Sequence, residues 1–242
     1  MRTVIFDLDG TLADTSGDLI AAANSCFRDL GLGDLLDPAR DALTAFHGGR
    51  AMLRLGFMRA SAQEQGAEGQ GAQGQALGQA LGQAPDEAAV DAQYPRLLAA
   101  YGAAIRVHTR AYPGAVAAVE ALRARGFAVG ICTNKPEALA HQLLTEMGIR
   151  DLFASLVGAD TLPVRKPDPA PYVAAVERAG GTVARSMLIG DTETDRRTGL
   201  AVGVPVALVT FGPEGPGIAR LAPEALLDRY EDLPALAERL LA

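Results

Sequence analysis

The stretch Thr3-Val4-Ile5-Phe6-Asp7-Leu8-Asp9-Gly10-Thr11-Leu12 decides the fold, because an apolar run leads directly into two acids and a glycine. A short run of β-branched and aromatic residues before a turn signal predicts a buried strand over residues 3–6. In an extended chain residues i and i+2 share one face, so Asp7 and Asp9 can point into one site. Gly10 then permits a turn that a larger residue would resist.

The two carboxylates indicate a metal site at the end of this strand. Like charges so close together disfavour joint ionisation unless a cation neutralises them. Mg2+ is usually held by one or two protein carboxylates together with substrate phosphate, so it is the natural partner. A lone D-x-D pair is equally typical of a strand followed by an Asx-type turn, and the choice depends on the rest of the chain.

Three later segments supply the other groups that phosphoryl transfer requires. Residues 127–132 predict a second buried strand, which ends in Thr133-Asn134-Lys135-Pro136. Residues 186–189 predict another, which ends in Gly190-Asp191, and Lys166-Pro167 stands just before a predicted helix. In open parallel sheets the ligand crevice lies outside the carboxyl ends of the strands. A hydroxyl, an ammonium group and carboxylates for a metal ion together suit a transferring phosphoryl group.

This ordered set resembles the haloacid dehalogenase superfamily, and within it the phosphoglycolate phosphatase-like branch. The matching motifs are residues 7–12, Thr133-Asn134, Lys166-Pro167, and Gly190-Asp191 with Asp195. With the pattern of strands and helices, the resemblance covers residues 1–58 and 86–242. It implies a Mg2+-dependent phosphate monoester hydrolase that acts through an aspartyl phosphate on a small phosphorylated metabolite. Within that branch 2-phosphoglycolate is the expected substrate.

The resemblance also implies roles for the residues that would contact the substrate. Asp7 is the expected nucleophile, and Asp9 is expected to protonate the leaving oxygen and later to activate water. Thr133, Asn134 and Lys166 are expected to bind phosphoryl oxygens. Thr133 and Lys166 act in catalysis as well, since Lys166 would offset the charge on Asp7.

The expected Mg2+ ligands are Asp7, the backbone carbonyl of Asp9, and Asp191. Asp195 has two interpretations of equal weight. It orients the cluster through hydrogen bonds from outside the metal site, or it is an acid favoured by the dipole at a helix N-terminus.

Lysine usage points to the same site independently. Of 22 basic residues only Lys135 and Lys166 are lysines, and both lie in the motif segments. Arginine fills the role of the soluble surface cation in this chain. A retained lysine therefore marks a place that needs a compact ammonium group rather than a planar guanidinium group. Compositional drift is the alternative explanation.

The segment His47-Gly48-Gly49-Arg50 is the best candidate for reading the rest of the substrate. Its paired glycines allow close backbone approach, and a helix that begins near Arg50 presents free N–H groups to an anion. Arg50 could grip a substrate carboxylate with two hydrogen bonds. The alternative, a glycine turn followed by a solvated arginine, stays open.

From Pro113 onward the chain alternates predicted helices and strands. Helices are expected at 114–125, 136–147, 169–179, 195–202 and 233–241, and strands at 127–132, 154–157, 186–189 and 204–208. Such alternation predicts a parallel sheet covered by helices on both faces. The expected fold class is therefore α/β, a doubly wound parallel sheet with a Rossmann-like core and an inserted helical cap.

Residues 15–108 are the expected cap, and residues 1–14 with 109–242 form the catalytic core. Leu19, Ala23, Phe27 and Leu30 recur at helical spacing, and further helices are expected at 38–46, 50–58 and 86–107. Within the cap, residues 61–84 form a Gln/Gly/Ala tract with repeated Gly-Gln and Gln-Ala-Leu-Gly units. Few of its side chains can pack, so the tract is expected to be mobile or weakly helical.

Composition limits the partners and the compartment. A net charge of −7 argues against a nucleic-acid partner but not against a small anionic substrate. No apolar run approaches the ~18 residues of a membrane span and no leader is evident, so a cytoplasmic protein is expected. Cys26 and Cys132 should be buried, reduced thiols. His47, His108 and His141 lack the spacing of zinc ligands.

Other functions of the same fold stay open. A sugar-phosphate phosphatase of the same superfamily is one alternative. A phosphomutase is less favoured, because such branches show two adjacent acids where Gly190 precedes Asp191 here. A dehalogenase is disfavoured more strongly, because that branch lacks the acid corresponding to Asp9. A non-catalytic binding protein would be expected to have lost a motif residue, and none is lost. The oligomeric state is not predicted.

Overall fold

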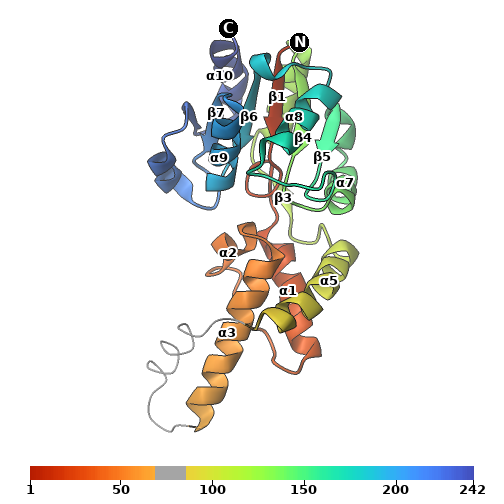
Figure 1. Ribbon diagram of the computed structural model, residues 1–242, viewed down its shortest axis with the longest axis vertical. Helices are drawn as coiled ribbons and strands as arrows, with labels where there is room; N and C mark the ends of the chain where they lie inside the picture. The colour runs from red at the N-terminus through yellow and green to blue at the C-terminus, as the bar shows by residue number, and fades with distance from the viewer. Residues whose placement is uncertain (69–85) are drawn as a thin grey trace. The chain divides into compact units, whose positions relative to one another are not determined.

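The computed structural model describes residues 1–68 and 86–242, and the chain divides into two compact units (Figure 1). The first unit comprises Met1–Thr15 and Thr109–Ala242, and the second comprises Ser16–His108. The first is an α/β unit, whereas the described part of the second is helical. Among the described residues, no helix is long and apolar enough to cross a membrane.

A six-stranded sheet forms the centre of the α/β unit, in the order β5-β4-β1-β6-β7-β8. The strands are β1 (Thr3–Phe6), β4 (Ala128–Cys132), β5 (Ser155–Val157), β6 (Ser186–Gly190), β7 (Val206–Val209) and β8 (Ala225–Leu227). Every neighbouring pair is parallel. The predicted doubly wound parallel sheet is therefore confirmed.

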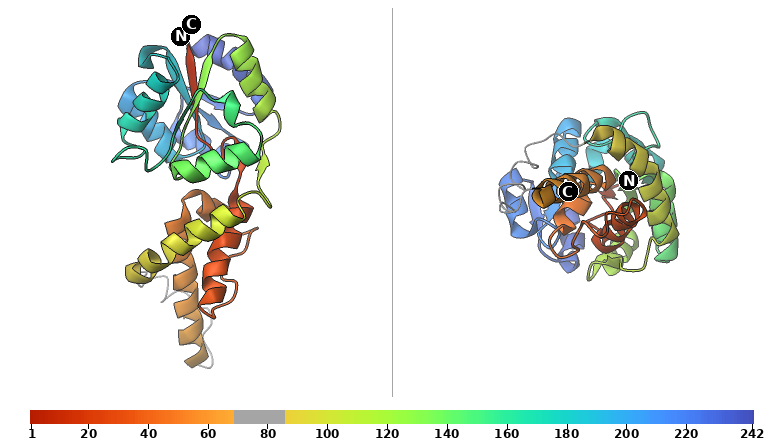
Figure 2. Two further views of the ribbon diagram at one scale, coloured as in Figure 1. Left: turned by 90° about the vertical axis from the view of Figure 1, so that its right-hand side faces the viewer. Right: turned by 90° about the horizontal axis from the view of Figure 1, so that it is seen from below.

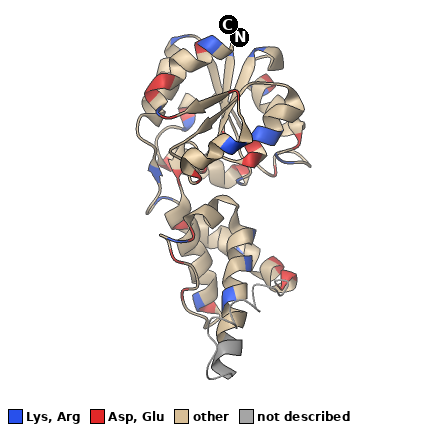
Figure 3. Cartoon of the chain, turned by 90° about the vertical axis from the view of Figure 1, so that its left-hand side faces the viewer, with Lys and Arg blue, Asp and Glu red and all other residues tan. Residues whose placement is uncertain are grey.

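The apolar sequences of the strands explain why the sheet is buried between layers of helices. None of the six strands contains a charged residue, as Figure 3 also shows by their uniform tan colour. All residues of β1, β4, β5, β6 and β7 are buried. A parallel sheet with both faces covered requires such continuous apolar runs.

Helices cover the sheet on both sides (Figure 2). They are α6 (Ala115–Ala124), α7 (Glu137–Glu146), α8 (Pro169–Arg178), α9 (Glu193–Val202) and α10 (Leu233–Leu240). Helix α8 packs against β1, β4, β5 and α9, whereas α6 packs against β4 and α10. Each boundary falls within two residues of its prediction.

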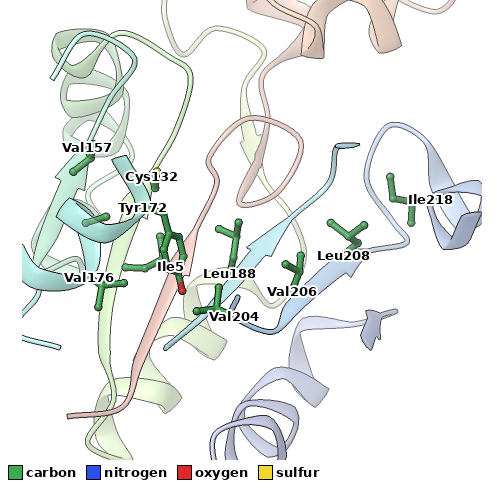
Figure 4. Close-up of a cluster of buried hydrophobic side chains, with 11 residues drawn as sticks. Ile5, Cys132, Val157, Tyr172, Val176, Leu188, Val204, Val206, Leu208 and Ile218 are labelled. Carbon is green, nitrogen blue, oxygen red and sulfur yellow. The ribbon is translucent and has the colours of Figure 1, made fainter. Parts of the chain in front are cut away.

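One buried cluster joins the strands to the helix on one side of the sheet (Figure 4). Ile5, Leu188 and Val206 come from three neighbouring strands, and Tyr172 and Val176 come from α8. The close-up shows these side chains gathered along the sheet. The Tyr172 hydroxyl keeps a hydrogen bond to Ser186 at 2.8 Å, so its burial leaves no polar group unpaired. Both cysteines are free and buried, as predicted.

Several short elements of the α/β unit have no counterpart among the predictions. Strands β2 (Ala13–Asp14) and β3 (Arg110–Ala111) form an antiparallel ribbon. Strand β8 and four short 3-10 helices complete the set: Arg150–Leu152, Val183–Arg185, Gly215–Leu221 and Tyr230–Asp232. All of these elements except Gly215–Leu221 have only two or three residues, which are too few to carry a periodic pattern, so tertiary contacts decide them.

The helical unit contains α1 (Ser16–Asp29), α2 (Ala42–Phe46), α3 (Gly49–Glu68) and α5 (Glu87–Ala103). The helix expected at 38–46 begins only at Ala42, because the Asp37 carboxylate accepts the N–H groups of Ala39 and Arg40 in a turn. Leu30 lies beyond the end of α1 and is 43% exposed, so it does not belong to the apolar stripe.

Two further helix limits in this unit differ from the predictions. The helix expected at 50–58 runs on to Glu68, so residues 61–68 of the Gln/Gly/Ala tract are helical, and the rest of the tract lies outside the described residues. The helix expected at 86–107 is capped by the Asp86 side chain and ends at Ala103.

Candidate active site

The three central strands end side by side. Phe6 of β1 pairs with Ile131 of β4 on one side and with Ile189 of β6 on the other. The next polar residues along these strands are Asp7, Thr133 and Asp191. The sheet thus brings together residues far apart in the sequence, at the edge where open parallel sheets bind ligands.

The loop after β1 is held in a defined conformation. The Asp7 carboxylate accepts the N–H of Leu8 at 2.7 Å, and the Asp7 N–H donates to Ile189 of β6 at 2.9 Å. Gly10 adopts a φ of 77°, which favours glycine, and its N–H donates to the carbonyl of Ala13. The loop therefore turns sharply after the second acid.

Lys166 lies between two carboxylates at the centre of the site. Its Nζ is 3.0 Å from Asp7 Oδ2 and 2.6 Å from Asp195 Oδ1. The Lys166 side chain is 1% exposed. Burial alone would lower the pKa of Lys166, but the charges of Asp195 and Asp7 outweigh burial and raise that pKa above its ordinary value. The two carboxylates therefore favour the charged form of Lys166.

Two acids of this cluster, Asp7 and Asp191, have raised pKa values. Burial raises the pKa of Asp7 to about 6, even though Lys166 opposes the shift. Burial, together with the charges of Asp195 and Asp7, raises the pKa of Asp191 well above its usual value. Desolvation of these two carboxylates therefore outweighs their attraction to the single ammonium group of Lys166. A second cation near Asp7 and Asp191 would stabilise their ionised forms.

Asp195 contacts both the start of α9 and Lys166. It is the third residue of α9, and its Oδ2 accepts the N–H groups of Asp191 and Thr192 in a capping box. Its Oδ1 holds Lys166. This close packing requires Gly190, because a Cβ there would lie 2.4 Å from the Cβ of Asp195.

The geometry fits a divalent cation held by Asp7 and Asp191. Carboxylate oxygens of Asp7, Asp191 and Asp195 lie within 4.8 Å of one another. Both oxygens of Asp195 already accept hydrogen bonds, whereas Asp191 Oδ2 is buried without a hydrogen-bond partner among the described residues. An unpaired buried carboxylate oxygen is costly unless a cation or a donor reaches it.

Thr133 and Asn134 follow β4 beside this cluster. Thr133 is buried, and its hydroxyl oxygen accepts the N–H of Lys135 at 3.2 Å. The Asn134 amide donates to the carbonyl of Lys166 at 3.0 Å, which ties the two motif segments together.

Arg50 belongs to the helical unit, where it forms an ion pair with Asp91 and lies over the ring of Tyr94.

Asp9 faces a different set of partners. Its Oδ1 accepts the Thr15 hydroxyl at 2.7 Å and lies 2.8 Å from Nζ of Lys135. The two lysines of the chain therefore each pair with one aspartate of the D-x-D motif.

Comparison with known proteins now identifies the family. The model of the haloacid dehalogenase-like hydrolase family matches residues 1–203. The chain belongs to this family.

This hydrolase is similar to curated relatives over nearly its whole length. It is 34% identical over 241 residues to a phosphoglycolate phosphatase of Agrobacterium fabrum, covering 98% of this chain and 93% of that protein. It is 35% identical over 232 residues to a phosphoglycolate phosphatase of Rhodospirillum rubrum, covering 96% and 89%. The structure of a predicted phosphoglycolate phosphatase from Haemophilus somnus has the same fold, with a TM-score of 0.79, 24% identity, and coverage of 98% and 97%.

Three residues of the hydrolase site were given no role on the basis of the sequence. The Thr11 hydroxyl donates to Asp191 Oδ1 at 2.7 Å, and the Tyr230 hydroxyl donates to the Thr11 carbonyl at 2.8 Å. Thr11 stands inside the first motif, which was the available signal, whereas nothing local marks Tyr230. Lys135 was noted for the scarcity of lysine but was given no role.

Proposed function

We propose that this protein is a Mg2+-dependent phosphate monoester hydrolase whose substrate is 2-phosphoglycolate. The observation that carries the reaction class is a buried cluster, in which Asp7 and Asp191 follow the carboxyl ends of neighbouring strands and Lys166 pairs with Asp7. The names of the full-length relatives support the choice of substrate.

In the proposed mechanism Asp7 attacks the phosphorus atom and forms an aspartyl phosphate while the bond to the leaving oxygen breaks. Asp9 gives a proton to that oxygen, so glycolate leaves with a neutral hydroxyl group rather than as an alkoxide. Asp9 then takes a proton from water as the water attacks phosphorus, which releases phosphate and restores Asp7. Splitting the hydrolysis into two displacements lets one carboxylate serve twice.

The remaining residues bind the phosphoryl group and balance its charge. Thr133, Asn134 and Lys166 would donate hydrogen bonds to phosphoryl oxygens. Because Lys166 also neutralises part of the charge on Asp7, it reduces the repulsion between nucleophile and substrate. A Mg2+ ion held by Asp7, Asp191 and the backbone carbonyl of Asp9 would supply a further positive charge, which would stabilise the ionised forms of the buried acids.

The helical unit, Ser16–His108, is proposed as the cap that reads the rest of the substrate. Arg50 would contribute to that task only by exchanging its ion pair with Asp91 for one with the substrate.

Phosphate release from 2-phosphoglycolate, measured against a panel of small phosphate esters with Mg2+ or with EDTA, tests the proposal. Turnover should require Mg2+, should be highest for 2-phosphoglycolate, and should collapse in Asp7→Asn. Wild-type turnover that survives EDTA, or a sugar phosphate as the best substrate, would overturn the corresponding part of the proposal.

A further inference from the structure

Lys135 is a buried cation that the mechanism above does not use. Its Nζ lies 2.8 Å from Asp9 Oδ1, and its side chain is 4% exposed. Its backbone is fixed on both sides, because its N–H donates to the Thr133 hydroxyl oxygen at 3.2 Å and its carbonyl accepts the N–H of Ala159 at 2.9 Å. Holding a lysine in so enclosed a place costs side-chain entropy and desolvation, which calls for a specific anionic partner.

Orientation of Asp9 does not by itself require this charge. The Thr15 hydroxyl already donates to Asp9 Oδ1 at 2.7 Å. A neutral donor such as this can fix the rotamer of a carboxylate. An ammonium group adds a full positive charge at the same position, and it carries three N–H donors that can serve more than one oxygen at a time.

Because Lys135 pairs with Asp9, its ammonium group lies near the expected position of the leaving oxygen. A general acid must lie within hydrogen-bond distance, about 3 Å, of the oxygen that it protonates. Since Lys135 Nζ is 2.8 Å from Asp9 Oδ1, it lies within about 8 Å of the leaving oxygen, whichever oxygen of the Asp9 carboxylate carries the proton. In 2-phosphoglycolate a single methylene carbon separates that oxygen from the carboxylate, which thus comes within reach of the ammonium group.

We propose that Lys135 binds the carboxylate of the substrate and thereby selects phosphate esters that carry an anionic group next to the leaving oxygen. This inference rests on the proposed function, because it assumes that Asp9 is the general acid and that the substrate is a carboxylate-bearing ester. It moves the recognition of the carboxylate from Arg50, which is engaged by Asp91 and Tyr94, to the α/β unit.

The test compares two substrates that differ only in this group, 2-phosphoglycolate and its uncharged amide, carbamoylmethyl phosphate. In Lys135→Met, kcat/KM should fall for 2-phosphoglycolate about 10- to 100-fold more than it falls for the amide. The reason is that only 2-phosphoglycolate loses a hydrogen bond between two charged groups. Lys135→Arg, which keeps the charge, should retain part of the preference for the carboxylate.

Thr15→Val is the matched control, because it removes the other donor to Asp9 and leaves the ammonium group in place. It should lower kcat/KM for both substrates by the same factor. Equal losses for both substrates in Lys135→Met, or a selective loss in Arg50→Ala instead, would overturn the role of Lys135 while leaving the proposed function intact. A wild-type enzyme that releases phosphate from other esters but not from 2-phosphoglycolate would overturn both.

Discussion

Asp7→Asn should make the protein more stable as well as inactive. The asparagine has nearly the same shape as the aspartate but carries no charge, so it resembles the protonated acid. In the folded protein Asp7 is buried beside Asp191 and Asp195, with Lys166 as its cationic partner. Burial holds its pKa at about 6, above the ordinary value of 3.8, so the folded protein disfavours the charge that the reaction needs.

The magnitude follows from this shift in the pKa of Asp7. A difference of about two pKa units corresponds to roughly 3 kcal/mol of unfolding free energy. Below about pH 4 the acid is protonated in the folded and the unfolded protein, so wild type and variant should be equally stable. As the pH rises from about 4 to 6 only the unfolded chain ionises, and the wild type loses this stability. Above pH 6 the variant should be more stable by the full amount.

Urea unfolding at pH 4, 6 and 8 in the presence of EDTA measures the difference, and the chelator removes divalent cations that would stabilise the ionised acid. Asp151→Asn, on the exposed surface of the same unit, is the control and should change little. A variant that is less stable than wild type at pH 8, or a difference that does not depend on pH, would refute the assigned electrostatics.

Three further predictions follow from the same site. Mg2+ at about 100 times its dissociation constant should stabilise the wild type by about 2.7 kcal/mol in thermal melts, and Asp191→Asn should abolish the effect; an equal rise in both proteins would exclude Asp191 as a ligand. Lys166→Met should cost about 3–5 kcal/mol in urea unfolding at pH 8, because it leaves Asp7 and Asp195 buried without their cation; a loss below 1 kcal/mol would contradict this. Gly190→Ala should cost about 1–3 kcal/mol and reduce turnover, because its methyl group would displace Asp195; unchanged melting and turnover would show that the contact is relieved without effect.

The sequence predicted the sheet because every central strand is a continuous apolar run followed by polar residues. That pattern is local, and the parallel register then carries Asp7, Thr133 and Asp191 to one edge without further information. The carboxylates of Asp7 and Asp191 and the ammonium group of Lys166 accordingly lie together.

Features that depend on partners distant in the sequence were not predictable. Tyr230 reaches the first motif across 219 positions, and no local pattern marks such a contact. The start of α2 was predicted too early, because a helical pattern of side chains does not reveal that the Asp37 carboxylate captures two N–H groups. Arg50 was chosen for its glycine-rich setting, and its pairing with Asp91 across 41 positions was not visible.

The formation of a phosphoryl group on Asp7 tests the central claim most directly, and Asp9→Asn with p-nitrophenyl phosphate offers the cleanest measurement. The nitrophenolate leaving group needs no proton, so the first displacement should proceed, whereas the loss of the base should stall the second. With Mg2+ present, the variant should release one equivalent of nitrophenolate in a burst, and acid-quenched protein should carry one phosphoryl group on the peptide that contains Asp7. Steady release without a burst, or a phosphoryl group on any other residue, would contradict the account.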